Sequence, residues 1–229
     1  DLARWIRHSR ITFKFDTAHP VGCTHHQKIA VLDNQVAVCG GIDMTDQRWD
    51  TREHKEDDPR RKTPHGRPYK PWHDAAMMME GEIAVALAQL GDDRWTCAGG
   101  DELPDVPESP GTPWPDALEA QFENVEIGIA RTRASYRDWD AVDEIEQLYL
   151  KQIGAAKRFI YAESQYFASR AIAEAIIARL QEDEPPEIVI VHPCHADGWL
   201  EQQAMEHARA ELVRAIEEAD KHRRFSLWS

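Results

Sequence analysis

The sequence predicts an α/β fold, and three observations support this prediction. The second half of the chain alternates short apolar strand patterns with longer segments of helical period. The first half contains two compact apolar strands on either side of a turn. Hydrophobic residues make up 42% of the 229 residues, which is enough for a sizeable core. Together these features favour a sandwich in which a mixed sheet carries helices on both faces.

A β-hairpin is predicted near the start of the chain. Residues 28–32 (KIAVL) and 36–39 are short apolar runs, and Asp33-Asn34-Gln35 between them is typical of a turn. The hairpin is expected to end at Gly40-Gly41. The alternating run ITFKF at residues 11–15 predicts one further strand before it.

Two loops are expected in the middle of the chain, separated by one strand and one helix. Residues 51–69 are charged and contain proline, which predicts a solvated loop, and residues 99–116 are rich in proline. Between these loops, residues 75–79 are a predicted strand and residues 83–90 are a predicted helix.

Strands and helices alternate from residue 125 onward. The predicted strands are residues 125–130, 159–162, 188–191 and 225–227. The predicted helices are residues 143–153, 171–180 and 204–219. Such alternation is the pattern of layered α/β folds.

Charge and cysteine content limit the classes of function. The formal net charge of −14 disfavours a nucleic-acid partner, which normally requires a basic surface, although a local basic pocket can still bind one phosphate. Four cysteines without a CxxC pair argue against a zinc site or a disulfide framework. No apolar run reaches the roughly 18 residues of a membrane span. The compartment stays open, with the cytoplasm or a membrane surface favoured.

One motif carries chemistry. Residues 26–33 (HQKIAVLD) fit the pattern H-x-K-x4-D. His26 and Lys28 are two residues apart in a predicted extended segment, so their side chains share a face. An imidazole can attack phosphorus or supply a proton, and an ammonium stabilises phosphoryl oxygens, which suits a phosphate diester without a metal. An isolated H-x-K pair is more often a solvated strand edge, so this interpretation depends on its context.

That context resembles the phospholipase D superfamily, whose signature is H-x-K-x4-D. The segments that follow the family pattern, in order, are residues 24–29 (THHQKI), 40–43 (GGID), 47–51 (QRWDT), 71–74 with 80–81 (PWHD and EG), and 159–167 (FIYAESQYF). The likeness is greatest to the eukaryotic-type branch that hydrolyses phosphatidylcholine. It implies two signatures that face each other, one histidine attacking phosphorus and the other protonating the leaving alcohol.

The resemblance implies a role for each matching residue of the signature. His26 is the expected nucleophile, which forms a phosphohistidine, and Lys28 is expected to bind the phosphate. Asp33 is expected to hold the turn, and Asp74 is expected to hydrogen-bond the far nitrogen of His26. From the residues alone, Asp74 is instead typical of a loop or N-cap aspartate.

The resemblance also points to substrate-binding residues. Gly40 and Gly41 are expected to let the chain pass close to the phosphate or to His26, with a simple tight turn as the alternative. Gln165 could reach the floor of the pocket, or could bond main-chain groups at a strand end. Ser164 departs from the family's usual Asn at this position.

The main departure from the family pattern is the missing second signature. His195, His207 and His222 are each followed at the second position by Asp or Arg instead of Lys. We therefore expect residues 1–229 to be one catalytic half, a fragment whose second HKD half lies in a missing C-terminal part. A second subunit or a degenerate chain is the alternative. His192 and His195 lack a third ligand, so no metal or other cofactor is expected, and calcium dependence stays open.

The expected function is hydrolysis of phospholipid phosphodiester bonds to phosphatidic acid and a free head-group alcohol, with transfer to a competing alcohol. The alternatives are a phosphatidyltransferase of the cardiolipin-synthase kind and a phosphate- or lipid-binding half-domain without turnover. Membrane contact is expected to be peripheral. The loops at residues 51–70 and 99–116, near Trp72 and Trp114, are candidates for lipid entry, with ordinary solvated loops as the default reading.

Overall fold

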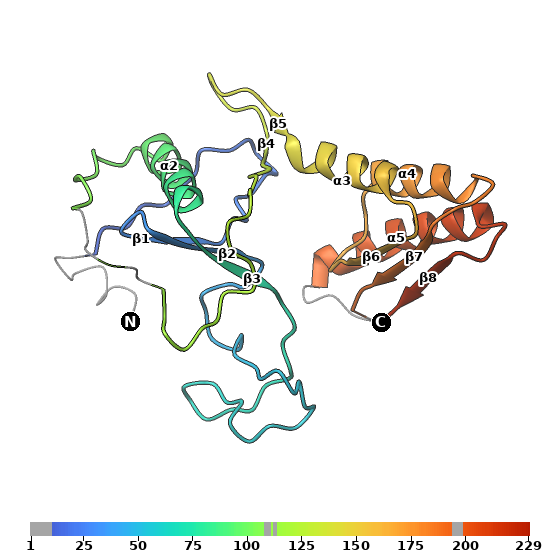
Figure 1. Cartoon of the computed structure of the whole chain (residues 1–229), viewed down its shortest axis with the longest axis horizontal. Coiled ribbons are helices and arrows are strands. Elements are labelled where there is room, and N and C mark those ends of the chain that lie inside the picture. Colours follow the sequence, from blue (N-terminus) through green and yellow to red (C-terminus); the bar gives the residue numbers. More distant parts are fainter. Residues whose placement is uncertain (1–10, 108–110, 112–113, 194–198) are drawn as a thin grey trace. The chain divides into compact units, whose positions relative to one another are not determined.

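The chain divides into two compact units, Asp1–Gly128 and Ile129–Ser229 (Figure 1). The computed structural model describes residues 11–107, 111, 114–193 and 199–229, with the side chains of the last range described from residue 209 onward. Helices and sheets occur in both units, which confirms the predicted α/β class. The expectation of a single catalytic half stays a prediction.

An antiparallel sheet and one helix form the first unit. The sheet has the order β1-β2-β3, with β1 at Ile29–Leu32, β2 at Val36–Gly40 and β3 at Ala76–Glu80, and the helix α2 covers Glu82–Cys97. β1 and β2 are the predicted hairpin, paired from Leu32 with Val36 to Ile29 with Cys39. The turn closes through the amide of Gln35, which donates to the carbonyl of Leu32 at 3.0 Å.

The core of the first unit lies between this sheet and α2. Its buried members are Ala37, Met79, Ala84 and Leu87. The strand members alternate with outward-facing neighbours, as the pleat of a strand requires. α2 is longer than the predicted helix because it continues through Gly91-Asp92-Asp93, residues that usually break a helix. Leu87 and Leu90 both pack on the sheet, so tertiary contacts support the helix through this weak stretch.

A parallel sheet and three helices form most of the second unit. The sheet has the order β6-β7-β8, with β6 at Phe159–Glu163, β7 at Glu187–Val191 and β8 at Phe225–Trp228. The helices are α3 at Glu144–Ala155, α4 at Arg170–Leu180 and α5 at Trp199–Ala219. A two-stranded sheet, β4 at Thr132–Arg133 and β5 at Val142–Asp143, precedes α3. The predicted β/α alternation from residue 143 onward is confirmed.

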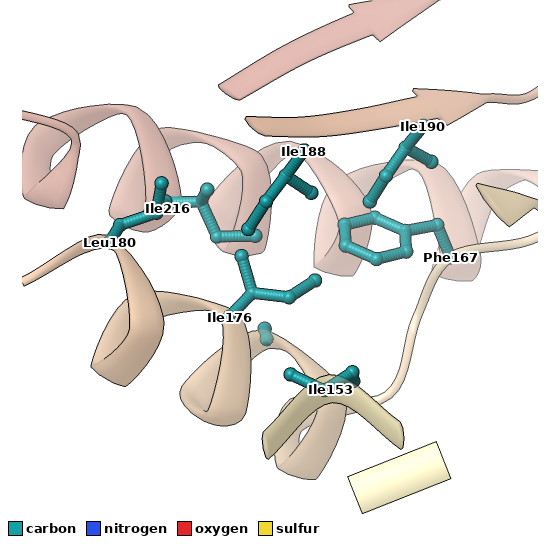
Figure 2. Packing of buried hydrophobic residues seen from close by; sticks show 8 residues of the cluster. Ile153, Phe167, Ile176, Leu180, Ile188, Ile190 and Ile216 are labelled. Carbon is teal, nitrogen blue, oxygen red and sulfur yellow. The ribbon is translucent and has the colours of Figure 1, made fainter. Parts of the chain in front are cut away.

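Aliphatic side chains from every layer meet in the core of the second unit (Figure 2). Ile153 comes from α3, Ile176 from α4, Ile188 and Ile190 from β7, and Ile216 from α5. The alternate residues of β7 lie on the other face of the sheet, where Tyr161 and Trp228 of the neighbouring strands are exposed. The described helices therefore cover one face of this sheet.

Three expectations about strands and layers differ from the structure. Residues 11–15 and 125–130 form no strand, and their apolar side chains, such as Phe15, are exposed. Both runs alternate correctly but have no partner strand among the described residues, and a strand needs a neighbour to satisfy its backbone. The predicted mixed sheet is divided into an antiparallel and a parallel sheet, and described helices pack on one face of each instead of on both.

The proline-rich run after α2 is irregular. Residues 99–107, 111 and 114–116 contain no helix or strand, as predicted for this loop, and residues 108–110 and 112–113 lie outside the described part. Cys23, Cys39 and Cys97 are free thiols, whereas Cys194 is not described. None of the helices in the described residues combines the length and the apolar character that crossing a membrane requires.

Candidate active site

His26 and Lys28 lie immediately before β1, at the end where β2 leaves the sheet. The amide of Gly40 donates to the carbonyl of Lys28 at 3.3 Å, so Lys28 is held opposite the last residue of β2. The Lys28 side chain is 12% exposed, and its ammonium donates to the carbonyl of His26 at 3.3 Å. The His26 residue is exposed, so its ring is accessible to a ligand beside a mostly buried cation.

Asp43 is the anionic partner of Lys28. The Lys28 ammonium is 3.1 Å from one carboxylate oxygen of Asp43, and the Arg48 guanidinium is 3.7 Å from the other. The hydrogen bond from Lys28 lowers the pKa of Asp43 and outweighs desolvation, and the charges of Lys28, Arg48 and His26 lower it further. Asp43 therefore occupies the place where a second anion, such as a phosphate oxygen, could contact the same cation.

The two glycines at the end of β2, Gly40 and Gly41, make room for the segment that carries Asp74. A Cβ atom on Gly41 would overlap the carboxylate of Asp74, and a Cβ atom on Gly40 would overlap the backbone of Ala75 and Ala76. The amide of Gly41 donates to the carbonyl of Ala75 at 3.0 Å, which keeps the two segments together. The glycines thus permit a close approach to the segment that carries Asp74, and the expected approach to the phosphate or to His26 stays a prediction.

Asp74 does not hydrogen-bond His26 in the described structure. One carboxylate oxygen of Asp74 accepts the amide of Ala75 at 2.7 Å. Gly40 is bonded to Lys28 on one side, and Gly41 is bonded to Ala75 on the other. The segment 40–41 therefore runs between Lys28, just before β1, and the segment that links Asp74 to β3. The pairing of Asp74 with His26 stays a prediction.

A buried ion pair fixes the segment between residues 50 and 72. The side chains of Arg61 and Asp50 are 1% and 7% exposed, and they are joined at 2.9 Å. Arg61 also donates to the carbonyls of Tyr69, Lys55 and Glu56. Most residues of this segment are exposed, as the sequence predicts for a loop, but its chain is wrapped around one buried guanidinium.

Asp50 connects this segment to the candidate site. Its carboxylate accepts the amides of Thr51 at 2.8 Å and Trp72 at 2.9 Å, in addition to the bond from Arg61. Burial raises the pKa of Asp50, but these hydrogen bonds outweigh it and hold the pKa at about 2. The Arg48 guanidinium lies over the Trp72 ring, 3.8 Å from the ring centroid, in a cation–π contact. Asp50 therefore joins Arg61 to Trp72. Arg48 continues this set of contacts from the Trp72 ring to Asp43, which contacts Lys28.

Asp33 lies at the opposite end of β1 from Lys28, and Gln165 belongs to the second unit. Asp33 is exposed at the hairpin turn, with a φ of 51°, and β1 separates it from Lys28. Gln165 is exposed just after β6 in the second unit. Its neighbour Ser164 accepts the amide of Phe167 at 3.1 Å, which supports the positive φ of the buried Phe167. Ser164 thus supplies a local acceptor, as an Asn side chain can.

Two histidines outside the signature have other neighbours. The Nε2 atom of His25 lies 3.1 Å from the Asp16 carboxylate, which also pairs with Arg94 of α2. The His25 ring therefore belongs to a contact between the N-terminal segment and α2. His192 is buried beside the carbonyl of Pro193, and His195 lies outside the described residues. Among the described residues, no three His, Cys, Asp or Glu side chains are grouped as metal ligands.

Sequence reasoning missed the charged residues that surround Lys28. Asp43, Arg48 and Asp50 all lie in the family-like segments GGID and QRWDT, but no role was inferred for them from the pattern. Arg61 was missed because it belongs to a polar, proline-containing run that predicts only a loop. A buried arginine leaves no periodic signal, since its partners are mostly backbone carbonyls.

Comparisons with known proteins agree with the motif and its setting. The family model described as phospholipase D matches residues 6–173. Phospholipase D alpha 1 of Zea mays is 31% identical over 195 residues, which cover 63% of this chain and 24% of that protein. Phospholipase D alpha 1 of Vigna unguiculata is 32% identical over 196 residues, and that of Arabidopsis thaliana is 29% identical over 211 residues, or 70% of this chain.

The relatives are much longer than this chain. The matched region spans only 24% to 26% of the Zea mays, Vigna unguiculata and Arabidopsis thaliana proteins. The family match nevertheless includes the hairpin, the segment 40–74 and the first half of the second unit. It contains His26, Lys28 and Asp74 in their expected order. The chain therefore belongs to the phospholipase D family of phosphodiesterases.

Proposed function

We propose that His26 and Lys28 supply the nucleophile and the phosphate-binding cation of a phospholipase D-type active site. The substrate would be a phospholipid diester, and the products phosphatidic acid and a free head-group alcohol. The observation that carries this proposal is the accessible His26 beside a Lys28 ammonium that is mostly buried. The names of the plant relatives support a phospholipid as the substrate class.

The proposed reaction has two displacements at phosphorus. A ring nitrogen of His26 attacks phosphorus, the bond from phosphorus to the head-group oxygen breaks, and that oxygen takes a proton from an acid of the second signature. Water then gives a proton to the same group of the second signature, now a base, and attacks the phosphohistidine; the phosphorus–nitrogen bond breaks, and phosphatidic acid leaves. A primary alcohol in place of water gives a phosphatidyl alcohol.

Lys28 acts by exchanging its anionic partner. Without substrate its ammonium contacts Asp43 at 3.1 Å, and a phosphoryl oxygen of the diester would take over part of this contact. The cation is already positioned by the carbonyl of His26, so little reorganisation is needed when negative charge develops on the phosphoryl oxygens. Asp43 keeps the mostly buried cation paired between turnovers.

Asp74, Gly40 and Gly41 position the nucleophile in this scheme. Asp74 would accept the far ring N–H of His26 once substrate is bound, which fixes the tautomer and stabilises the imidazolium. Gly40 and Gly41 are required because side chains there would displace the segment that carries Asp74. Asp33 would hold the hairpin turn, and Gln165 would bind substrate, with main-chain groups as the alternative partner.

The second signature has to come from other residues, since the sequence contains one H-x-K pair. We propose that it belongs to a further part of the same polypeptide, with a second subunit as the less favoured source. The span of about a quarter of the relatives' length is compatible with this arrangement. Contact with the membrane would be peripheral, through surfaces of this chain and of the second half.

A transphosphatidylation assay tests the proposal. Phosphatidylcholine and a primary alcohol are offered to the product of the complete gene, with His26→Ala and His25→Ala as matched variants of adjacent histidines. Phosphatidyl alcohol should form with the natural protein and with His25→Ala, and should be lost with His26→Ala. Equal loss in both variants, or no product from folded natural protein, would reject the lipid phosphodiesterase and leave a phosphate-binding domain.

A further inference from the structure

The basic residues of the stretch 59–73 are divided into paired and unpaired sets. Residues 59–73 contain five Lys or Arg residues and no Asp or Glu, in a chain whose net charge is −14. Arg61 is buried against Asp50, and Arg60 contacts Asp58 at 2.6 Å. The remaining cations of this stretch point into solvent instead.

The unpaired set consists of Lys62, Arg67 and Lys70, together with His65. All four residues are exposed. None of their side chains has an ion pair or a hydrogen bond within the part of the chain that the structure describes. In an acidic protein this is a concentration of positive charge that its own acidic residues do not neutralise.

Residues 61–70, called here the cationic finger, hold these cations on a braced hairpin. Lys62 pairs with Pro68 in an antiparallel bridge, and the amide of Thr63 donates to the carbonyl of Arg67 at 2.8 Å. The tip is a turn in which Gly66 has a φ of 78° and donates to Thr63 at 2.8 Å. The base is fixed by the buried Arg61. The charges are therefore presented by a defined hairpin, which limits the entropy lost on binding.

An exposed aromatic residue lies at the base of the cationic finger. The Tyr69 hydroxyl donates to the carbonyl of Trp49 at 2.9 Å, and the Arg60 guanidinium lies over the Trp49 ring at 5.6 Å. Trp49 is 50% exposed. Basic side chains beside an exposed tryptophan are the combination that binds anionic membrane surfaces, where the ring enters the head-group region.

We propose that the cationic finger, with Trp49, docks this unit on an anionic phospholipid surface. The choice of a membrane over another polyanion rests on the proposed lipid substrate. The net charge of the whole chain does not oppose the contact, because at physiological salt charges more than about 8 Å away are largely screened. Three unpaired cations and one aromatic ring are also a small footprint for a nucleic-acid partner, which usually requires an extended basic face.

Vesicle sedimentation of the 229-residue chain tests the inference. Vesicles of phosphatidylcholine alone are compared with a three-to-one mixture of phosphatidylcholine and phosphatidylserine. Each Lys or Arg near an anionic surface strengthens binding about five-fold, so the triple variant Lys62→Gln, Arg67→Gln, Lys70→Gln should bind the mixed vesicles roughly 100-fold more weakly. High salt should weaken the natural chain to the same level.

A matched triple variant controls for net charge. Lys151, Lys157 and Arg158 are exposed residues of the second unit, and their replacement by Gln removes the same charge. This control should bind within about two- to three-fold of the natural chain. Equal weakening by both triple variants would overturn the inference, as would equal binding to both kinds of vesicle. Loss of oligonucleotide binding without loss of vesicle binding would assign the finger to a nucleic acid instead.

The inference and the proposed function can fail separately. Vesicle binding requires no turnover, so a finger-dependent contact with no phosphatidyl transfer by the natural protein would retain the docking surface and reject the enzyme. Conversely, the triple variant could keep full activity on a soluble short-chain phospholipid and also keep full binding to the mixed vesicles. That result would reject the docking surface and retain the enzyme.

Discussion

The core of the second unit and the segment 43–74 of the first unit are held together by different physical means. Ile176, Ile188 and Ile216 are between 0% and 2% exposed and pack as aliphatic side chains between layers. In the segment 43–74, the side chains of Arg61, Asp58 and Asp50 are instead 1%, 4% and 7% exposed, and they are fixed by hydrogen bonds. Apolar packing builds the scaffold, and a buried ionic centre orders the residues around the candidate active site.

The largest effect is expected from the apolar core. Replacing Ile188 by Ala leaves a cavity between β7 and the helices and should lower the free energy of unfolding by about 2–5 kcal/mol. Val189→Ala is the matched control, since the next residue lies half-buried on the uncovered face of the sheet and should cost about 1 kcal/mol or less. Urea unfolding followed by circular dichroism measures both, and equal effects would contradict the one-sided packing of this sheet.

The ionic centre should affect its own segment and leave the second unit unchanged. Arg61→Ala leaves Asp50 with fewer donors and frees the carbonyls of Lys55 and Tyr69, so amide hydrogen exchange of residues 49–72 should accelerate roughly ten-fold or more. The exposed Arg52 provides the control Arg52→Ala, which should leave the exchange rates unchanged. Acceleration that extends to β6, β7 and β8 would show that the two regions are not independent.

The close approach at Gly41 should affect activity more than stability. The Cβ atom of Gly41→Ala would displace the Asp74 carboxylate, and a shift of about 1 Å in a positioning group can reduce the rate roughly 100-fold. In Gly91→Ala the new Cβ meets no atom within 4 Å, and the change removes a glycine from α2, so it should stabilise the protein by up to about 1 kcal/mol at full activity. Full activity in Gly41→Ala would remove Asp74 from the mechanism.

The smallest expected effect is the response of Asp50 to acid. Because its pKa falls from 3.8 in the unfolded chain to about 2 in the folded one, its contribution to stability is fully present above pH 3.8 and is lost as the pH falls towards 2. The melting temperature of the natural chain should therefore fall more steeply in this window than that of Asp50→Asn. Parallel pH profiles of the two proteins would show that Asp50 has no such shift.

The apolar periodicity of the sequence was sufficient to predict most of the elements. The hairpin of β1 and β2, the strands β6 and β7, and the helices α3 and α4 lie within a few residues of their predicted positions. These elements bury a regular face, and such a face repeats with a fixed period in the sequence. The strands predicted at residues 11–15 and 125–130 were wrong because alternation describes one strand and says nothing of whether a partner exists.

The candidate site was predictable only in part. The predicted strand at residues 28–32 located His26 and Lys28 at the start of the hairpin, and β1 begins directly after them at Ile29. The partners of Lys28 were not predicted because Asp43 and Arg48 reach it from a loop, where no period relates sequence to direction. The buried Arg61 was missed for the same reason, since its acceptors are carbonyls that any residue type can supply.

Trapping a covalent adduct on His26 tests the central claim most directly. A phosphodiester with a nitrophenolate leaving group requires no protonation of that group, so the 229-residue chain can be tested without a second signature. If His26 is the nucleophile, a stoichiometric burst of nitrophenolate is expected, together with a phosphoryl group on the peptide that contains His26, found by mass spectrometry after rapid quenching. The burst should be absent in His26→Ala and retained in His25→Ala. A folded chain that forms no adduct, or that forms one at another residue, would contradict His26 as the nucleophile.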